Sequence, residues 1–341
     1  MVGIGEWRVS RRGTHVDEDD VRVRPGRSKS RPRSKDRPTF EEARPGVVVT
    51  VDRGRFTVDT GDREEFAVKA RDLGRKGVVV GDRVGVIGEE PGSLDHPVRI
   101  VAREPRTSEL RRTADDSDPI ERVVVANADQ LAIVTAIANP EPSIGLIDRS
   151  LVAAMDAGIA PIIIVTKIDL RGPDTIREMY APLDVPVFPV GKGAPTPELL
   201  ETLTGHDTVL IGHSGVGKST LVNALVPLAQ RTTGSVNLTT GKGRHTSTSV
   251  RAFRYPGGGH IIDTPGIRSF GLAHVDPQNL VLAFPDLAGF TVDCPRSCSH
   301  DEPECALTPF AESPHLGPRV ASLHRLLRSR AIPEDQVNST R

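Results

Sequence analysis

The sequence has few of the features that mark membrane, secreted or disulfide-rich proteins. Its 341 residues contain no apolar run of about 18 residues, the length needed for a membrane-spanning helix. The N-terminus has no apolar segment ahead of a small-residue cleavage site, and three cysteines are too few for a disulfide framework. We therefore expect a cytoplasmic protein with no membrane partner.

A net charge of one sign is also lacking, since 44 Lys and Arg oppose 45 Asp and Glu. The charge is unevenly distributed, however: residues 22–37 hold eight basic residues and one acid. Three prolines and few apolar residues in and just after this stretch disfavour an ordered core. We predict that residues 1–45 are a disordered basic tail, either simply solvated or used as an arm for a polyanion.

The next part of the chain, residues 46–104, is rich in short β-prone runs separated by turns with Gly and Asp. About five strands in this length fit a small barrel, and we predict an OB-like one, with an SH3-like barrel as the alternative. RNA contact and a purely structural role both stay open for it. Residues 105–121 are polar and charged, and we predict a linker there.

In residues 122–271, apolar runs alternate with helical patterns. The runs are residues 131–137, 159–165, 185–190, 209–211 and 260–262, and the helical stretches are residues 147–157, 173–180, 197–203 and 218–225. Such alternation predicts a mostly parallel α/β sheet, in which ligands bind at the carboxyl ends of the strands.

One of these apolar runs leads into the pattern G-x-x-x-x-G-K-S, which is followed by helix-forming residues. Glycines let backbone N–H groups surround phosphates, the lysine reaches the β- and γ-oxygens, and the serine binds Mg²⁺. A plain Gly-rich turn is the alternative. The residues predicted to bind nucleotide here are Gly212, His213, Ser214, Gly215, Val216, Gly217, Lys218, Ser219 and Thr220.

The strand pattern at 260–262 ends in Asp263-Thr264-Pro265-Gly266. An acid at this place holds Mg²⁺ through water, and the glycine can offer its N–H to a γ-phosphate. The polar, Gly-rich residues 232–249 lie between the two motifs and fit a switch loop. The predicted Mg²⁺ ligands are Ser219, Thr246 and Asp263, with Ser247 and Thr248 as alternative switch hydroxyls.

A third motif bears on which nucleotide base is bound. It consists of Thr166, Lys167, Ile168 and Asp169 and is close to the N-K-x-D signature of GTPases. Its carboxylate can accept hydrogen bonds from guanine N1–H and the exocyclic amine, which adenine does not present there. Threonine stands where asparagine is usual, and the later loop at 190–193 has glycines but no serine. We predict GTP rather than ATP.

The order of the motifs differs from that of ordinary GTPases, because the base motif precedes the phosphate loop and Asp263 follows it. Permuting a chain changes connectivity and leaves the contacts in place. We therefore predict a circularly permuted GTPase with Mg²⁺ as cofactor. The usual catalytic glutamine is missing, since Ile267 stands near its place, so we expect slow intrinsic hydrolysis that a partner accelerates.

The three cysteines all lie within twelve residues, together with one histidine. A Cys₃His set is typical of structural zinc. We predict one Zn²⁺ in a mainly helical domain at 272–330, followed by a tail at 331–341. Within that domain we expect helices at 280–284 and 320–328, and the arginines of the second could form a solvated face or an RNA contact. The predicted zinc ligands are Cys294, Cys298, His300 and Cys305.

A barrel followed by T-K-I-D, G-H-S-G-V-G-K-S, G-R-H-T-S-T, D-T-P-G and the cysteine cluster resembles the ribosome small subunit-dependent GTPase A family (RsgA). The resemblance spans residues 46 to about 330. It implies an OB fold, a permuted GTPase and a zinc domain that act on the 30S subunit late in its maturation. It also implies contact with 16S rRNA and GTP hydrolysis to GDP and phosphate that the subunit stimulates.

The same resemblance implies a catalytic role for His245, although a loop histidine without such a role is the alternative. We expect a monomer. Two other functions stay open: a nucleotide-switched RNA-binding regulator that does not act on the ribosome, and an ATP-dependent kinase or transporter component with the same phosphate loop.

Overall fold

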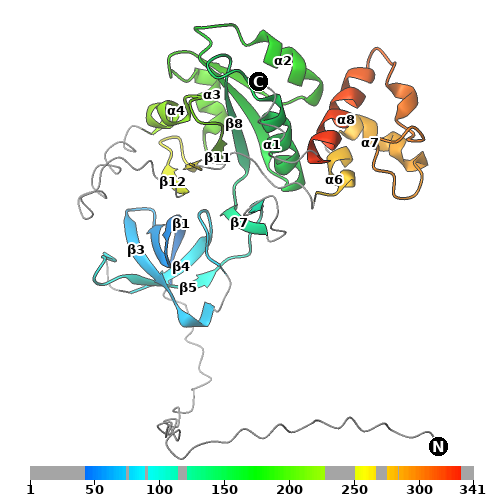
Figure 1. The fold of residues 1–341 in the computed structure, drawn as a ribbon. Helices are drawn as coiled ribbons and strands as arrows, with labels where there is room; N and C mark the ends of the chain where they lie inside the picture. Colours follow the sequence, from blue (N-terminus) through cyan, green and yellow to red (C-terminus); the bar gives the residue numbers. More distant parts are fainter. Residues whose placement is uncertain are drawn as a thin grey trace, which may run out of the picture. The chain divides into compact units, whose positions relative to one another are not determined.

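The structure is a computed structural model, and it describes residues 43–73, 77–88, 91–113, 121–226, 250–265, 275–282 and 284–331 (Figure 1). These residues belong to one compact unit, Phe40–Arg341. Most of the predicted N-terminal tail, and all of the predicted C-terminal tail at 331–341 except Ala331, lie outside the described residues.

A closed barrel forms the first part of the described chain. Its strands are β1 (Arg44–Asp52), β2 (Arg55–Asp59), β3 (Glu64–Lys69), β4 (Arg83–Ile87) and β5 (Val98–Arg103). They pair in the order β1-β2-β3-β5-β4, and β1 also pairs with β4, which closes the ring. Alternate apolar side chains such as Val48, Val58 and Val86 fill the interior. The predicted OB-like barrel is confirmed.

The second part is a parallel sheet. It consists of β8 (Gln130–Ala136), β9 (Ala160–Thr166), β10 (Val187–Val190), β11 (Asp207–Ile211) and β13 (His260–Asp263), in the order β10-β9-β8-β11-β13. At its edge β12 (Arg251–Arg254) runs antiparallel to β13. The predicted mostly parallel sheet is confirmed. The antiparallel strand was not expected from the sequence.

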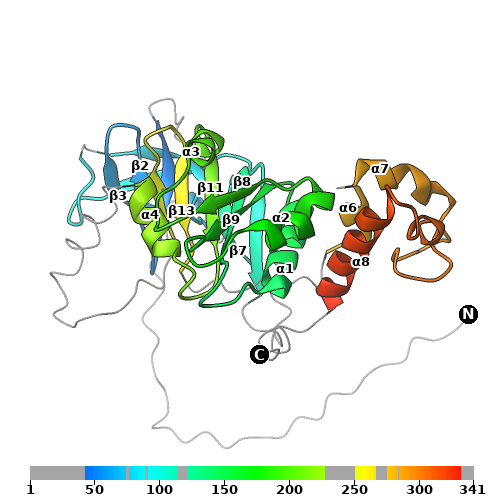
Figure 2. The ribbon, with the colours of Figure 1, turned by 90° about the horizontal axis from the view of Figure 1, so that it is seen from above.

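Helices cover both faces of this sheet (Figure 2). They are α1 (Ile144–Asp156), α2 (Asp174–Tyr180), α3 (Pro197–Leu203) and α4 (Lys218–Leu225). Because side chains alternate along a strand, Ile133 of β8 packs in one core with α1 and α2, while Val134 packs in the other with α3 and α4. All residues of β8 are buried, as expected for a central parallel strand.

The described residues of the predicted linker at 105–121 include one strand and the start of another. Within it, β6 (Glu109–Thr113) pairs antiparallel with β7 (Glu121–Ala126) to form a two-stranded sheet. Arg106 forms ion pairs with Asp82 and Glu109. Residues 44 and 45, placed in the tail from the sequence, already belong to β1, and Val80 forms an isolated bridge with Val125.

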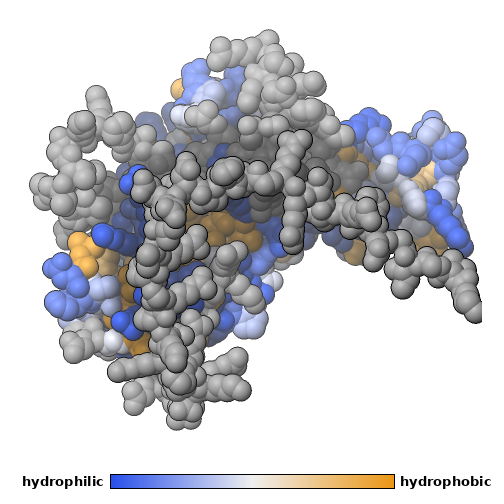
Figure 3. All heavy atoms as spheres, turned by 60° about the horizontal axis from the view of Figure 1, so that its bottom comes forward, coloured by the Kyte–Doolittle hydropathy of each residue, from blue (hydrophilic) through white to orange (hydrophobic). Residues whose placement is uncertain are grey.

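The C-terminal part is mainly helical, as predicted, with α6 (Pro277–Leu282), α7 (Pro285–Ala288) and α8 (Gly317–Ala331). Short 3-10 helices lie at Arg71–Leu73, Ala181–Leu183, Gly289–Asp293 and Thr308–Phe310. Over the described residues, no helix has both the length and the apolarity to cross a membrane. The face in Figure 3 mixes hydrophilic residues with smaller hydrophobic areas.

Three arginines of α8, Arg319, Arg325 and Arg328, pair with acidic side chains. Arg319 binds Asp184 and Asp286, each at 2.8 Å, and Arg328 binds Asp301 at 2.8 Å. Arg325 Nε donates to Asp148 Oδ2 of α1 at 2.9 Å. These guanidinium groups therefore hold α8 against its neighbours, and their charges are matched inside the molecule.

Asp148 is the buried member of this set. Its side chain is 3% exposed, and it also accepts a hydrogen bond from the Tyr180 hydroxyl at 3.0 Å. Burial raises the pKa of its carboxyl, and Arg325 and Tyr180 oppose this shift. The carboxylate thus depends on Arg325 for charge compensation.

We expect Arg325→Met to destabilise the packing of α8 by about 2–3 kcal/mol, because it leaves Asp148 without its countercharge. This is below the cost for fully buried pairs, since the Arg325 side chain is 32% exposed. Denaturant unfolding and hydrogen exchange of the α8 amides measure the effect. The matched control Arg328→Met breaks an exposed pair and should cost less than about 1 kcal/mol. Equal losses in the two variants would contradict this account.

Candidate nucleotide site and metal centre

The phosphate loop connects the end of β11 to α4. A Cβ on Gly212 would lie 2.3 Å from the Val134 carbonyl oxygen, so only glycine fits there. Gly215 and Gly217 have φ of +81° and +91°, which favour glycine, and Gly217 is the N-cap of α4. Ser214, Gly215, Ser219 and Thr220 are exposed. The loop therefore presents a helix N-terminus to solvent, as phosphate binding requires.

Lys218 and Asp263 meet at this edge of the sheet. The Lys218 ammonium forms an ion pair with Asp263, and both side chains are mostly buried. Asp263 reaches this position because β13 pairs in parallel with β11, with Leu210 opposite it. The buried Thr264 hydroxyl donates to the Leu210 carbonyl at 2.7 Å and fixes the chain just after the strand. The lysine and the acid are thus close enough to serve one phosphate–metal group.

Thr166, at the end of β9, connects the base motif to the phosphate loop. Its hydroxyl lies within hydrogen-bond distance of the Val216 carbonyl oxygen, and 3.2 Å from that of Thr135. The side chain is buried at 5% exposure, and a Cβ on Gly217 would lie 3.7 Å from its hydroxyl oxygen. A hydroxyl has a single proton, so it can donate fully to only one of the two carbonyls. This threonine braces the two loops at the position where GTPases usually have asparagine.

The rest of the base motif lies between two further loops. Lys167 has φ of +57°, and its ammonium donates to the Asn139 carbonyl in the loop after β8. Asp169 Oδ1 accepts a hydrogen bond from the Lys192 backbone N–H at 3.2 Å. Gly193 approaches α4 so closely that a Cβ there would lie 2.7 Å from Thr220 Cγ2. The loop at 191–193 therefore joins the base motif to the phosphate-loop helix.

The sequence did not identify Asn139 as part of this site. Its place directly after β8, at the carboxyl edge of the sheet, could have indicated it. Of the other predicted residues, Ile168 packs near Gly191, with 3.3 Å between Ile168 Cγ1 and a Cβ built there, and His213 lies in the phosphate loop. Gly266, Thr246 and His245 fall outside the described residues, and so do the alternatives Ser247 and Thr248.

We expect Thr166→Val to weaken guanine nucleotide binding about tenfold, because the Val216 carbonyl loses a donor and the two loops lose their brace. Thr166→Ser keeps the hydroxyl and should bind within about threefold of the unchanged protein. Titration with a fluorescent GDP analogue measures both variants. Wild-type affinity in Thr166→Val would show that the hydroxyl does not brace the loops.

The predicted zinc ligands come together in the C-terminal part. The ligand atoms of Cys294, Cys298, His300 and Cys305 all lie within 4.8 Å of one another. His300 Nδ1 is 3.6 Å from Cys294 Sγ and 3.8 Å from Cys305 Sγ. Three of the four residues are buried. Thiolates and imidazole suit zinc, and four such ligands make a closed structural site.

Neighbouring groups orient these ligands. The side-chain amide nitrogen of Gln278 lies 2.9 Å from His300 Nε2, and Nδ1 faces the sulfur atoms of Cys294 and Cys305. Backbone N–H groups of His300 and Leu307 point at Cys298 Sγ and Cys305 Sγ, each at 3.4 Å. Such outer contacts are typical of metal-bound cysteine and histidine. The residues present therefore fit a zinc ion.

Comparison with known proteins agrees with this geometry. The family model described as RsgA GTPase matches residues 103–273. A curated relative from Pseudomonas aeruginosa, named small ribosomal subunit biogenesis GTPase RsgA, is 43% identical over 69% of this chain and 71% of its own length. The chain belongs to the RsgA family. It is therefore a GTP-hydrolysing enzyme, and the GTPase family implies Mg²⁺ with the nucleotide.

Other RsgA relatives extend the match. The RsgA protein of Nitrosomonas europaea is 36% identical over 83% of this chain and 90% of its own length. The solved structure of YjeQ from Thermotoga maritima superposes with a TM-score of 0.60 at 26% identity, covering 83% of this chain and 98% of that one. YloQ, described as a circularly permuted GTPase, gives 0.62 at 25% identity, covering 86% and 97%. The resemblance inferred from the motifs is confirmed.

Proposed function

We propose that this RsgA-family GTPase binds the small (30S) ribosomal subunit in its GTP state, assists late maturation of the subunit, and leaves after hydrolysis to GDP and phosphate. The observation that carries the proposal is the meeting of three motifs at one sheet edge in permuted order, in a chain that also holds an OB-like barrel and a Cys₃His cluster. Relatives that share most of this chain are named for small-subunit biogenesis.

We assign the following roles in the nucleotide site. Lys218 leaves Asp263 to contact the β- and γ-phosphates, and the backbone N–H groups of the phosphate loop surround them. Ser219 and Asp263 hold Mg²⁺, which neutralises charge on the phosphates, together with Thr246 from the switch. Asp169 recognises guanine and Gly266 senses the γ-phosphate. His245 is the proposed catalytic group.

In this account the four-ligand cluster holds one structural Zn²⁺, and the protein acts as a cytoplasmic monomer that contacts 16S rRNA. The proposed domain limits follow the sequence, except that the barrel begins at Arg44, and β6 and β7 join the barrel to the GTPase. Hydrolysis is slow in isolation, because Ile267 provides no group to orient water. The subunit supplies or orders what is missing.

The test is the GTP hydrolysis rate with purified 30S particles, 50S particles and free 16S rRNA. We expect at least about tenfold stimulation by 30S particles alone, and none in Lys218→Ala, which lacks the phosphate-binding lysine. No stimulation by 30S particles would contradict the proposal. Equal stimulation by free RNA would instead favour a regulator that does not act on the ribosome.

A further inference from the structure

The barrel and the GTPase sheet are joined at the strand β12. Thr50 of β1 pairs with Arg251 of β12, which makes the barrel continuous with the sheet. Arg251 also binds Glu64 of β3, with 3.2 Å between NH2 and Oε2. In the β12–β13 pair, Arg251 lies directly opposite Asp263. One barrel contact is therefore made by the residue beside the proposed Mg²⁺ ligand.

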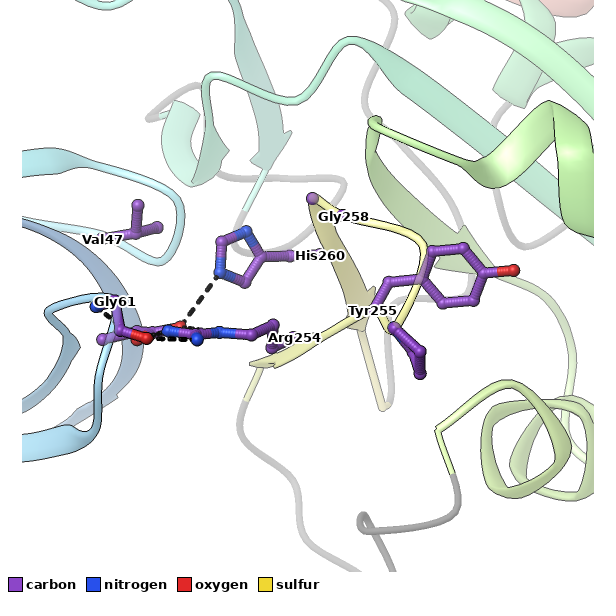
Figure 4. A pocket seen from close by; sticks show the side chains of 9 residues that line it. Val47, Gly61, Arg254, Tyr255, Gly258 and His260 are labelled. Atoms are coloured by element: carbon purple, nitrogen blue, oxygen red, sulfur yellow. Dashed lines mark hydrogen bonds and ion pairs between the residues drawn. The ribbon is translucent and has the colours of Figure 1, made fainter.

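A second contact lies at the other end of the same strand pair (Figure 4). Arg254 donates two hydrogen bonds to the Asp59 carboxylate at the end of β2, and one to the Gly61 carbonyl. Asp59 is 7% exposed. Its burial tends to raise the pKa of the carboxyl, but the hydrogen bonds from Arg254 and the Gly61 N–H outweigh this and lower it. Asp59 is thus a buried carboxylate held by a GTPase-side arginine.

His260, opposite Arg254 at the start of β13, completes this contact. Its Nε2 lies 3.5 Å from Asp59 Oδ2, and its Nδ1 lies 2.8 Å from Asp207 Oδ1 of β11. Burial tends to lower the pKa of the imidazole, but the two carboxylates prevail and raise it. His260 thus contacts the barrel through Asp59 and the neighbouring strand β11 through Asp207.

The strand that carries His260 also carries Asp263. Three residue steps separate them, about 10 Å along a strand. The two residues between them, Ile261 and Ile262, are 0% and 1% exposed and pack on opposite faces of the sheet. A close-packed strand of this kind moves as a unit. A shift of Asp263 from Lys218 to Mg²⁺ would therefore displace β13 and its partner β12 together.

We propose that the β12–β13 pair is the joint that transmits the nucleotide state to the barrel, through Arg251 with Glu64 and through Arg254 and His260 with Asp59. With GTP and Mg²⁺ bound, Asp263 would leave Lys218 to hold the metal, and the strand pair would shift the barrel residues Asp59 and Glu64 that it contacts. The barrel then takes a different position in the GTP and GDP states. This inference rests on the GTPase activity of the family and does not require the ribosome as partner.

A cavity of about 330 Å³ lies beside this joint, lined by Asp59, Arg254, Tyr255 and His260 among others. It could instead be read as an anion site, since the Arg254 guanidinium and the His260 imidazole line it. Both groups already have carboxylate partners, Arg254 in Asp59 and His260 in Asp59 and Asp207. The polar side chains that line the cavity therefore stabilise the contact between the barrel and the sheet.

Coupling between two sites is reciprocal, so weakening the joint must change how the enzyme distinguishes GTP from GDP. The variants are Asp59→Asn and Glu64→Gln, alone and combined. Asp59→Asn removes the charge that binds Arg254 but keeps an oxygen that can accept the Gly61 N–H, so the local turn is retained. Neither residue is in the nucleotide site. The readout is the ratio of the dissociation constants for GDP and a non-hydrolysable GTP analogue, without ribosomes. We expect the double variant to change this ratio at least about fivefold.

The matched control is Asp174→Asn, which neutralises an exposed carboxylate of α2 paired at 4.0 Å, and it should leave the ratio unchanged. A ratio in the double variant within about twofold of the unchanged protein would overturn the proposal. If the variants do not fold, hydrogen exchange of the unchanged protein decides. Protection of the β12 amides and of residues 59–61 from exchange must differ between the GTP-analogue and GDP states. Equal protection in the two states would overturn the proposal. If the variants lose only the stimulation of GTP hydrolysis by 30S particles, that result would bear on the proposed function and not on this inference.

Discussion

Asp169→Asn is expected to change the preferred substrate from GTP to XTP. A carboxylate accepts two hydrogen bonds from guanine, one from N1–H and one from the exocyclic amine. An amide keeps one acceptor and adds a donor, which matches the carbonyl that xanthine carries in place of that amine. With guanine, the variant loses the bond to the amine, sets two donors against each other and removes the charge from the bond to N1–H. Together these cost about 3–6 kcal/mol, so we expect kcat/KM for GTP to fall about 10²–10⁴-fold.

The substitution should leave the loop in place, because an Asn oxygen can still accept the Lys192 N–H that Asp169 Oδ1 accepts. Hydrolysis of GTP, XTP and ATP by the variant measures the change, with Asp174→Asn as the control for a lost carboxylate. Recovery of activity with XTP would show that the defect lies in base recognition. Unchanged turnover of GTP would show that Asp169 does not read the base.

Cys305→Ser is expected to abolish zinc binding and to unfold the segment around the cluster. The four ligand atoms lie within 4.8 Å of one another, so the loss of one thiolate leaves only three ligands for a tetrahedral zinc ion. Zinc bound to such sets contributes on the order of 10–16 kcal/mol of apparent binding free energy, most of which stabilises the local fold. Hydrogen exchange at residues 284–310 should rise to that of an unfolded chain.

The nucleotide site should survive this change, because the phosphate loop and base motif lie in the parallel sheet. Metal content by elemental analysis should be one zinc per chain in the unchanged protein and near zero in Cys305→Ser. The control Arg296→Gln alters an exposed residue between two ligands and should keep the metal. Full zinc content in Cys305→Ser, or none in the unchanged protein, would contradict the assignment.

Strong local patterns explain what the sequence predicted well. The helices α3 and α4 begin and end as expected, because Pro197 follows a Thr196 cap and Gly217 ends the phosphate loop. Position 212 accepts only glycine, since any Cβ there would clash with the Val134 carbonyl oxygen. The metal cluster was also found, because four ligands in a short segment cannot lie far apart.

What the sequence did not predict depends on partners far away in the chain. Periodicity placed the α8 arginines on one face, but the partners of Arg319 and Arg325 are Asp184 and Asp148, 135 and 177 residues away. Strand β12 is four residues long, too short for a recognisable period, and it forms because β13 offers an edge. Thr166 departs from the usual asparagine of the base motif, and only the structure shows that its hydroxyl contacts the Val216 carbonyl of the phosphate loop.

The central claim is that the nucleotide state controls binding to the small ribosomal subunit, and co-sedimentation tests it most directly. The purified protein is centrifuged with 30S, 50S and 70S particles in the presence of a non-hydrolysable GTP analogue or GDP. The account predicts that the protein pellets with 30S particles in the analogue state and is released with GDP. Absence of enrichment on 30S particles in the analogue state, or equal binding in both states, would contradict it.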